Sequence, residues 1–140
     1  MSSIFAPDLL AGRSVLVTGG GTGLGKAAAA ELIACGARVT ICGRREEILA
    51  EAAAELGAAY VPGDIREPGD ARRIVDFALE RHGRLDVLVN NAGGQYFTPA
   101  EAIEPKGWRA VTRLNVGGTE RMSRLVAARA ALEWVIPGSP

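Results

Sequence analysis

SVLVTGGGTGLG, residues 14–25, is the stretch that decides the fold. Its first part, Ser14–Thr18, is apolar and β-branched and predicts a buried strand. The glycines that follow predict a tight turn. The alanine-rich run that begins at Gly23 predicts a helix, with Gly36 as the residue that ends it. This order of strand, glycine turn and helix predicts the first half of a β-α-β unit.

The remainder of the chain continues the alternation. Further strands are expected over 38–42, 59–61 and 86–90, and further helices over 45–56 and 68–83. After a loop of small residues, apolar positions recur at helical spacing over 107–132. Alternating strands and helices predict a parallel sheet with right-handed crossovers. We therefore expect an α/β, Rossmann-type doubly wound sheet, N-terminal half only, with strand order 3-2-1-4. Residues 1–140 would form a single, incomplete dinucleotide-binding domain.

Composition limits the classes of protein to consider. The chain has 140 residues, 48% of them hydrophobic, and a formal net charge of +0, so it predicts one globular domain and no nucleic-acid or membrane partner. Cys35 and Cys42 are not spaced as a C-x-x-C or His-paired set, which argues against a disulfide scaffold and predicts no metal site. No leader or long apolar run is seen, and we expect a cytoplasmic location.

The glycine turn predicts a phosphate site. Glycines let a pyrophosphate approach the backbone, and the free N–H groups and dipole of the following helix hold its charge. Gly20 to Lys26 nearly spells a nucleoside-triphosphatase loop, but Ala27 stands where a magnesium-binding hydroxyl is needed, which excludes that class. Two interpretations of Lys26 stay open: a place near the phosphate, or a solvated lysine in the first helical turn.

The end of the second expected strand bears on which dinucleotide is bound. An NAD site usually has an acidic residue there, which binds the ribose 2′-hydroxyl. This chain has Gly43-Arg44-Arg45 and no acid, and a guanidinium fork suits a phosphate. NADP(H) is therefore favoured over NAD(H), with Arg44 the preferred ligand and Arg45 either a second ligand or a solvated residue. The missing acid also weakens a methyltransferase interpretation.

Four motifs together resemble the short-chain dehydrogenase/reductase family. They are Thr18-Gly-x-x-x-Gly-x-Gly25, Asp64-Ile65, Asn90-Asn-Ala-Gly93 and Asn115, in the family's order and spacing as far as about Arg129. Within that family, residues 90–101 and Lys106-Gly-Trp108 are most similar to trans-2-enoyl-CoA reductases. The 2,4-dienoyl-CoA reductases and the citronellol-type dehydrogenases are close alternatives.

The resemblance implies roles for these residues. The contacts to cofactor phosphates and ribose would come from the turn, at Gly19, Thr22, Gly23, Leu24 and Gly25. Asp64 and Ile65 would frame the adenine. Asn91, Ala92 and Gly93 would line the nicotinamide ribose, with Asn91 also tying neighbouring strands together. Asn115 would be the catalytic-helix asparagine, whose local kink holds a water in a proton relay.

The residues by themselves also allow plainer roles. Asp64 follows Gly63 and could be a turn or cap residue. Asn90 could bridge backbone groups as readily as it could bind a ligand. Asn115 could simply be a polar residue that interrupts an apolar helix. Tyr96 is expected to pack under its loop, Trp108 to lie in the core, and His82 to be a helix C-terminal cation or a solvated residue.

The family's acid–base pair, Tyr-x-x-x-Lys, is absent from this sequence. Four residues past Tyr60 is Asp64, and four past Tyr96 is Ala100. The family is usually longer, so the chain is interpreted as C-terminally truncated, with truncation, a frameshift or a gene-model artefact as alternatives. By family, it would be an NADP(H)-dependent oxidoreductase that transfers hydride to a carbonyl or enoyl substrate, such as an enoyl-CoA, with this chain holding the cofactor half.

The alternative is a catalytically silent dinucleotide-binding or interaction module. In either case we expect dinucleotide binding without appreciable turnover. A missing strand neighbour would leave the strand over 86–90 as an exposed apolar edge. The helix over 107–132 would then expose its apolar stripe, or bury it in a homo-oligomer.

Overall fold

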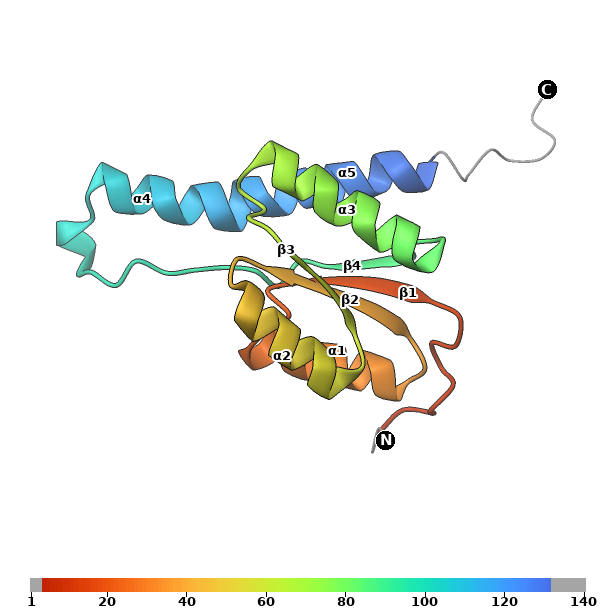
Figure 1. The fold of residues 1–140 in the computed structure, drawn as a ribbon. Coiled ribbons are helices and arrows are strands. Elements are labelled where there is room, and N and C mark those ends of the chain that lie inside the picture. Colours follow the sequence, from red (N-terminus) through yellow and green to blue (C-terminus); the bar gives the residue numbers. More distant parts are fainter. Residues whose placement is uncertain (1–3, 132–140) are drawn as a thin grey trace, which may run out of the picture.

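The computed structural model describes residues 4–131, and these form a parallel sheet with helices on both faces (Figure 1). The elements, in chain order, are β1 (Ser14–Thr18), α1 (Gly23–Ala34), β2 (Arg38–Gly43), α2 (Glu46–Leu56), β3 (Ala59–Pro62), α3 (Pro68–His82), β4 (Val87–Val89), η1 (Ala100–Ala102), α4 (Pro105–Thr112), η2 (Arg113–Gly118) and α5 (Thr119–Ala131). The strand order is β3-β2-β1-β4, and every pairing is parallel. The predicted fold class and strand order are confirmed.

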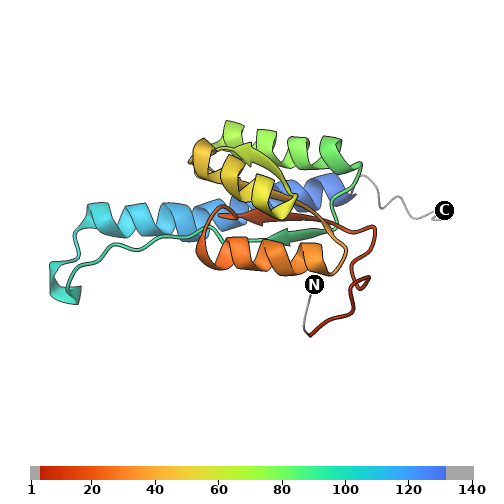
Figure 2. The same ribbon diagram turned by 60° about the horizontal axis from the view of Figure 1, so that its bottom comes forward.

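The two faces of the sheet carry separate cores. Helices α1 and α2 cover one face, and α3 and α5 cover the other (Figures 1 and 2). Val15 and Val17 pack with the α1–α2 layer, whereas Leu16 between them packs with the α3–α5 layer. Successive side chains of a strand point to opposite faces, so a strand covered on both sides is apolar throughout. All five residues of β1 are buried for this reason.

Local sequence signals explain most helix ends. Gly57 and Gly83 adopt left-handed conformations, with φ of 71° and 73°, directly after α2 and α3. Glycine takes this conformation without a Cβ penalty, which is why it ends helices. Helix α1 ends at Ala34, before Gly36, whose φ is 90°. The predicted bounds therefore agree with the structure to within a residue or two.

Strand β4 is shorter than the predicted range of 86–90. Its neighbours bond outside the ladder: the Asp86 carboxylate accepts from the backbone amide of Ser14 at 2.8 Å, and the Asn91 amide donates to the Thr18 hydroxyl at 3.1 Å. These side-chain bonds link the residues on either side of β4 to the two ends of β1. Strand β4 forms one edge of the described sheet, and Val87 is exposed there.

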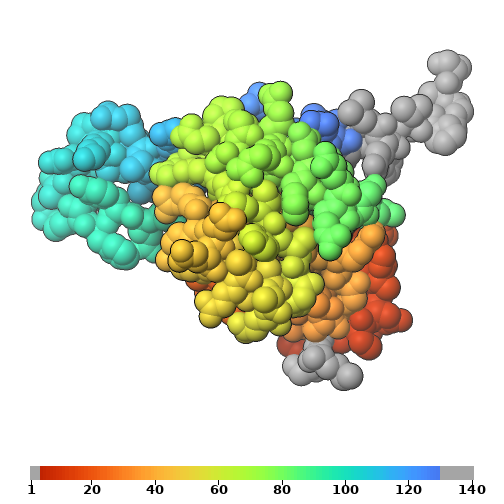
Figure 3. Space-filling model, viewed as in Figure 1, coloured from red at the N-terminus to blue at the C-terminus, as the bar shows by residue number. Residues whose placement is uncertain are grey.

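Residues 94–112, which we call the arm, extend away from the sheet and end in α4 (Figure 1). The space-filling view shows the arm, in teal, reaching beyond the body of the molecule (Figure 3). Trp108 lies on it with 64% of its surface exposed, so its predicted core position is wrong. The reason is that α4 lies beyond the sheet, which leaves the indole ring no sheet face to pack against.

The predicted helix over 107–132 is three consecutive helical segments. Helix α4 leads into a π-helical stretch, η2, and then into α5, which packs along α3. Within the expected apolar stripe, Met122 is fully buried, while Trp108 is 64% exposed. The last predicted residue, Leu132, lies outside the described residues. No helix within residues 4–131 is long and apolar enough to cross a bilayer.

His82 is neither the helix-end cation nor the solvated residue that the sequence suggested. Its ring is half-buried, and Nε2 lies 3.1 Å from the hydroxyl of Thr40, a fully buried residue of β2. Burial lowers the pKa of His82, and the nearby charges of Arg38 and Arg81 lower it further. The imidazole therefore acts as a neutral hydrogen-bonding group between α3 and the sheet.

Candidate functional site

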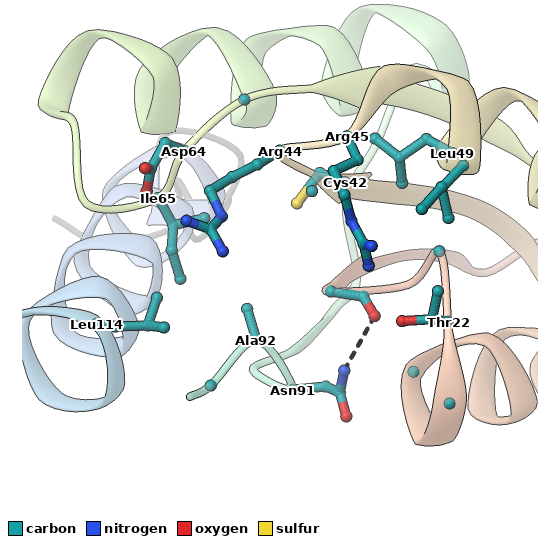
Figure 4. Close-up of a pocket in the computed structure, with 18 of the residues that line it drawn as sticks. Thr22, Cys42, Arg44, Arg45, Leu49, Asp64, Ile65, Asn91, Ala92 and Leu114 are labelled. Carbon is teal, nitrogen blue, oxygen red and sulfur yellow. Dashed lines mark hydrogen bonds between the residues drawn. The ribbon is translucent and has the colours of Figure 1, made fainter. Parts of the chain in front are cut away.

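A cleft of about 400 Å³ opens at the carboxyl ends of the strands. It is bounded by the glycine turn after β1, the arginine pair after β2, the loop after β3 and the segment after β4 (Figure 4). Strands β1 and β4 flank the point where the chain order of the sheet reverses. Ligands of doubly wound sheets bind at this edge and at this reversal.

Backbone amides at the start of α1 have no acceptor within residues 4–131. The amides of Gly19 and Gly20 both donate to the Cys42 carbonyl, at 2.8 and 3.3 Å, and extend the sheet. The next bonded amide along the chain is that of Lys26, which donates to the Thr22 carbonyl at 3.2 Å. The free amides between them belong to Gly21, Thr22, Gly23, Leu24 and Gly25, of which the last four lie at the start of α1. Together with the positive end of the α1 dipole, they are suited to binding an anion.

Gly19 therefore differs from the other predicted turn residues. It lines the cleft, but its amide is occupied by the sheet, so any contact to a ligand would come from its Cα or carbonyl. Its φ of 68° lies in the left-handed region. A Cβ at this position would lie 3.0 Å from the Cα of Ala92, so the glycine also permits the close approach of the segment after β4.

Gly25 allows α1 to lie directly on this turn. A Cβ there would overlap the Gly19 carbonyl oxygen and the side-chain nitrogen of Asn91. The overlap with the carbonyl cannot be relieved easily, because that oxygen belongs to the backbone and cannot move aside as the end of a flexible side chain can. The third glycine of the motif is thus required for packing, and it keeps the free amides over the cleft.

Thr18 and Asn91 join the two loops that flank the cleft. The Asn91 side-chain amide donates to the carbonyls of Thr18 and Gly19, at 3.0 and 3.2 Å. The Thr18 hydroxyl accepts from the backbone amides of Asn91 and Ala92, at 3.1 and 3.0 Å, and donates to the Val89 carbonyl at 3.3 Å. This geometry agrees with the strand-tying role expected for Asn91. The role of Thr18 was missed, because a threonine that ends a strand carries no signal of its distant partners.

Arg44 and Arg45 both line the cleft, and neither forms an ion pair within the described residues. In Figure 4 the Arg45 side chain points toward the turn that carries Thr22, and Arg44 lies nearer Asp64 and Ile65. Two exposed guanidinium groups without carboxylate partners are suited to a ligand phosphate. Lys26 does not join them: its ammonium lies 2.5 Å from Glu55 on α2, and it is not among the cleft residues.

Asp64 and Ile65 form the far end of the cleft from Thr22 (Figure 4). The Asp64 carboxylate also accepts from the backbone amide of Arg66 at 2.9 Å, so the turn role suggested by the sequence exists as well. Position in the cleft and a role in the turn are therefore combined in one residue.

Asn115 lies beside a second, polar cavity of about 450 Å³ that adjoins the first at Asn91, Ala92 and Gly93. Its side-chain oxygen accepts from the Gly94 amide, and its nitrogen donates to the Gly94 carbonyl, both at 2.9 Å. The surrounding backbone is π-helical, which agrees with the local kink that the resemblance implied. Such bulges in helices are frequently found at functional sites.

Other candidate residues have structural positions. The Asn90 side chain donates to the Ser123 hydroxyl at 3.0 Å and thus ties β4 to α5. The Tyr96 ring lies against Gly107, where a Cβ would come within 2.5 Å of it, but the residue is 47% exposed, so the expected packing is only partial. Burial raises the pKa of the Cys42 thiol to about 12, which keeps it protonated. Within residues 4–131, no three metal-binding side chains gather at one place.

Fold and cleft define a doubly wound α/β protein with an anion-binding turn at the carboxyl edge of its sheet. The chain belongs to the short chain dehydrogenase family, whose model matches residues 13–131. It is 37% identical, over 100% of its length, to the peroxisomal 2,4-dienoyl-CoA reductase of Arabidopsis thaliana, of which it covers 47%. Over 76% of its length it is 42% identical to a rhamnolipids biosynthesis 3-oxoacyl-[acyl-carrier-protein] reductase of Pseudomonas aeruginosa, of which it covers 43%.

Solved structures agree with this assignment. A short chain dehydrogenase from Bacillus anthracis superposes with a TM-score of 0.83 at 33% identity, covering 87% of this chain and 53% of that one. The Pseudomonas aeruginosa RhlG/NADP active-site complex gives a TM-score of 0.82 at 37% identity, covering 88% of this chain and 50% of the other. The chain thus spans about half the length of the relatives it matches.

Proposed function

We propose that this chain binds a dinucleotide, NADP(H) in preference to NAD(H), as the cofactor half of a short-chain oxidoreductase. The observation that carries the proposal is the pairing, on one cleft, of free amides at the start of α1 with two exposed arginines that form no ion pair within residues 4–131. The amides suit a diphosphate bridge, and the arginines suit an additional phosphate on the ribose. The structure of a relative in complex with NADP supports the same cofactor class.

The residues of the cleft fit such a cofactor along its whole length. The diphosphate would lie on the amides of Thr22 to Gly25, and the adenine between Arg44 and the loop of Asp64 and Ile65. The nicotinamide end would then reach Asn91 to Gly93, where the second cavity begins. When bound, the nicotinamide ring accepts or donates a hydride.

Titration of the chain with NADPH and NADH tests the cofactor preference. Arg44→Ala and Arg45→Ala should each weaken NADPH binding by about 10- to 100-fold and leave NADH binding nearly unchanged, because a charge-assisted hydrogen bond to the phosphate is lost. Arg72→Ala is the matched control, since Arg72 is exposed on α3 and away from the cleft. An unchanged preference in both arginine variants would overturn the assignment.

For the reaction, we propose hydride transfer to a carbonyl or an enoyl group, with an enoyl-CoA as the substrate class. The names of relatives support it, since they include 2,4-dienoyl-CoA and 3-oxoacyl reductases. Asn115 would belong to the proton-transfer side of this site, where it faces the second cavity. Because the sequence has no Tyr-x-x-x-Lys, we expect the 140-residue chain alone to bind cofactor without turnover. Family-like rates with NADPH and an enoyl-CoA would contradict this.

A second candidate function is that of an interaction module, and the exposed apolar side chains of the arm and of η2 favour it. Phe97 is 90% exposed, Trp108 64% and Val116 65%. Clustered apolar exposure is typical of a surface that another chain covers. We propose self-association through the segment 107–132, which sedimentation of the wild type and of Trp108→Ser would test. A monomeric wild type at high concentration would refute it.

A further inference from the structure

The π-helical stretch η2 holds Asn115 against the segment that follows β4. A π-helix is wound more loosely than an α-helix, so η2 places more of the chain in its turn than α4 and α5 do on either side. Within η2, the Asn115 side chain accepts from the Gly94 amide and donates to the Gly94 carbonyl, both at 2.9 Å. Both residues line the second cavity. The winding of η2 therefore determines where the Asn115 side chain lies in that cavity.

The other end of η2 rests on the loop after β3. Arg121, in the first turn of α5, donates through Nη1 to the Ile65 carbonyl at 2.9 Å. Gly118 is buried against the Ile65 side chain, and a Cβ there would lie 2.7 Å from it. Ile65 is itself only 5% exposed, and it lies at the same end of the first cleft as Leu114 of η2 (Figure 4). Two contacts thus fix this end of η2 to one residue of the loop.

The remaining contacts of this region set the rotation of α5 less firmly. Met122 is fully buried and holds α5 on the sheet, but a methionine side chain is flexible and adapts to small rotations of its helix. Arg113 pairs with Glu67 of the same loop, and both side chains are more than half exposed. Such surface pairs contribute little. The hydrogen bond from Arg121 is therefore the directed contact that fixes α5 against the loop.

Two anchors together keep the loose turn in place. Asn115 is tied to the segment after β4, and Arg121 to the loop after β3. An α-helical turn between them would shift the register by one residue and rotate one anchor relative to the other by about 100°. Because both anchors cannot be kept after such a rotation, the pair of contacts stabilises the π-helical turn.

We propose that Arg121 is a positioning residue, which holds Asn115 at the second cavity by fixing η2 against the loop after β3. Arg121 lines neither cavity, so it acts only through Asn115. The importance of this placement for a reaction rests on the proposed function, in which Asn115 belongs to the proton-transfer side of the site. The placement itself is a property of the ligand-free chain, and it can be measured there.

NMR measurement of water exchange at the Gly94 amide tests the inference on the ligand-free 140-residue chain. In wild type this amide should exchange about five- to tenfold more slowly than an unbonded glycine amide, because it donates to Asn115. Asn115→Ala should remove this protection. Arg121→Met keeps an unbranched apolar stem but has no donor, and it should lower the protection to below about twofold. Arg121→Lys retains a donor and should keep at least about half of the wild-type protection.

Arg124→Met is the matched control, since Arg124 lies on the same helix and its ion pair with Glu120, at 3.0 Å, stays within α5. It should keep the wild-type protection. Gly118→Ala displaces Ile65 and should lower the protection as Arg121→Met does, so it tests the same anchor if that variant does not fold. Circular dichroism establishes that each variant is folded.

Either of two results would overturn the inference while the proposed function stands. One is a folded Arg121→Met or Gly118→Ala with the wild-type protection, and the other is a wild-type Gly94 amide that exchanges as if unbonded. Failure of both NADPH and NADH to bind would instead refute the proposed function, and the exchange of Gly94 would still decide what positions Asn115.

Discussion

Replacing Thr18 by valine should destabilise the chain, because its hydroxyl bonds to three backbone groups at the end of β4. The hydroxyl accepts from the amides of Asn91 and Ala92 and donates to the Val89 carbonyl. The Asn91 amide also donates to that carbonyl, at 3.0 Å, so only the Ala92 amide has the hydroxyl as its one acceptor among the described residues. Valine has nearly the same shape, and Thr18 is fully buried, so no water can replace the lost oxygen at that point. The variant therefore tests hydrogen bonding with little change in packing.

The magnitude follows from the groups left without partners. The Ala92 amide loses its acceptor, whereas the Asn91 amide and the Val89 carbonyl keep the bond between them, and an unsatisfied buried group costs about 1–3 kcal/mol. Asn91 and Ala92 are only half-buried, so part of this cost is recovered by relaxation toward solvent. We expect the free energy of unfolding to fall by about 1–2 kcal/mol.

Urea unfolding followed by circular dichroism measures this change. Thr22→Val is the matched control: Thr22 is exposed and makes no capping hydrogen bond, so its substitution should change the free energy of unfolding by less than about 0.5 kcal/mol. If Thr18→Val costs no more than the control, the hydroxyl does not join the two loops, and the account of the cleft's framework is wrong.

Three further predictions concern packing and pH. Gly25→Ala should cost about 1–3 kcal/mol of stability and weaken NADPH binding, whereas Gly69→Ala, which meets open space in α3, should be neutral or slightly stabilising in the same urea titration. Hydrogen bonds from Arg84 lower the pKa of Asp86 from 3.8 to about 2, so the carboxylate stabilises the fold above pH 4 and this contribution is lost between those values. The stability difference between wild type and Asp86→Asn should accordingly be larger at pH 5 than at pH 2.5; an equal difference at both would exclude the ionic role. Burial lowers the pKa of His82 below 6.5, so the unfolded chain takes up the proton first, and wild type should lose stability as pH falls below 6.5 more steeply than His82→Gln. Parallel pH profiles of the two proteins would count against a buried neutral imidazole.

The parts of the fold that depend on residues close together in the sequence could be predicted. Residues 14–25 specify β1, the turn and the start of α1 through β-branched side chains and glycines, whose effects are local. The strand order followed from alternation and the handedness of crossovers. The cleft residues from the turn, the arginine pair and the loop after β3 are indeed brought together, because parallel strands place their carboxyl ends at one edge.

Features that depend on distant partners could not be predicted. An apolar residue such as Trp108 is assigned to the core by periodicity, but periodicity does not say whether a surface lies opposite it. The bonds of Thr18 to the segment after β4, and of Arg121 to the Ile65 carbonyl, span more than fifty positions and leave no local pattern. His82 was misjudged for the same reason, since its partner Thr40 lies on another element.

The free amides at the start of α1 give this molecule an unusual contrast in deuterium uptake. Backbone protons of β1 are bonded in the sheet and shielded by helices on either side, so they exchange only when the whole chain opens. A few positions later, the protons of Thr22, Gly23 and Leu24 are unbonded and open to solvent, and they exchange at once. A dinucleotide seated on them would slow this uptake, so occupancy of the turn can be followed proton by proton without any catalytic assay.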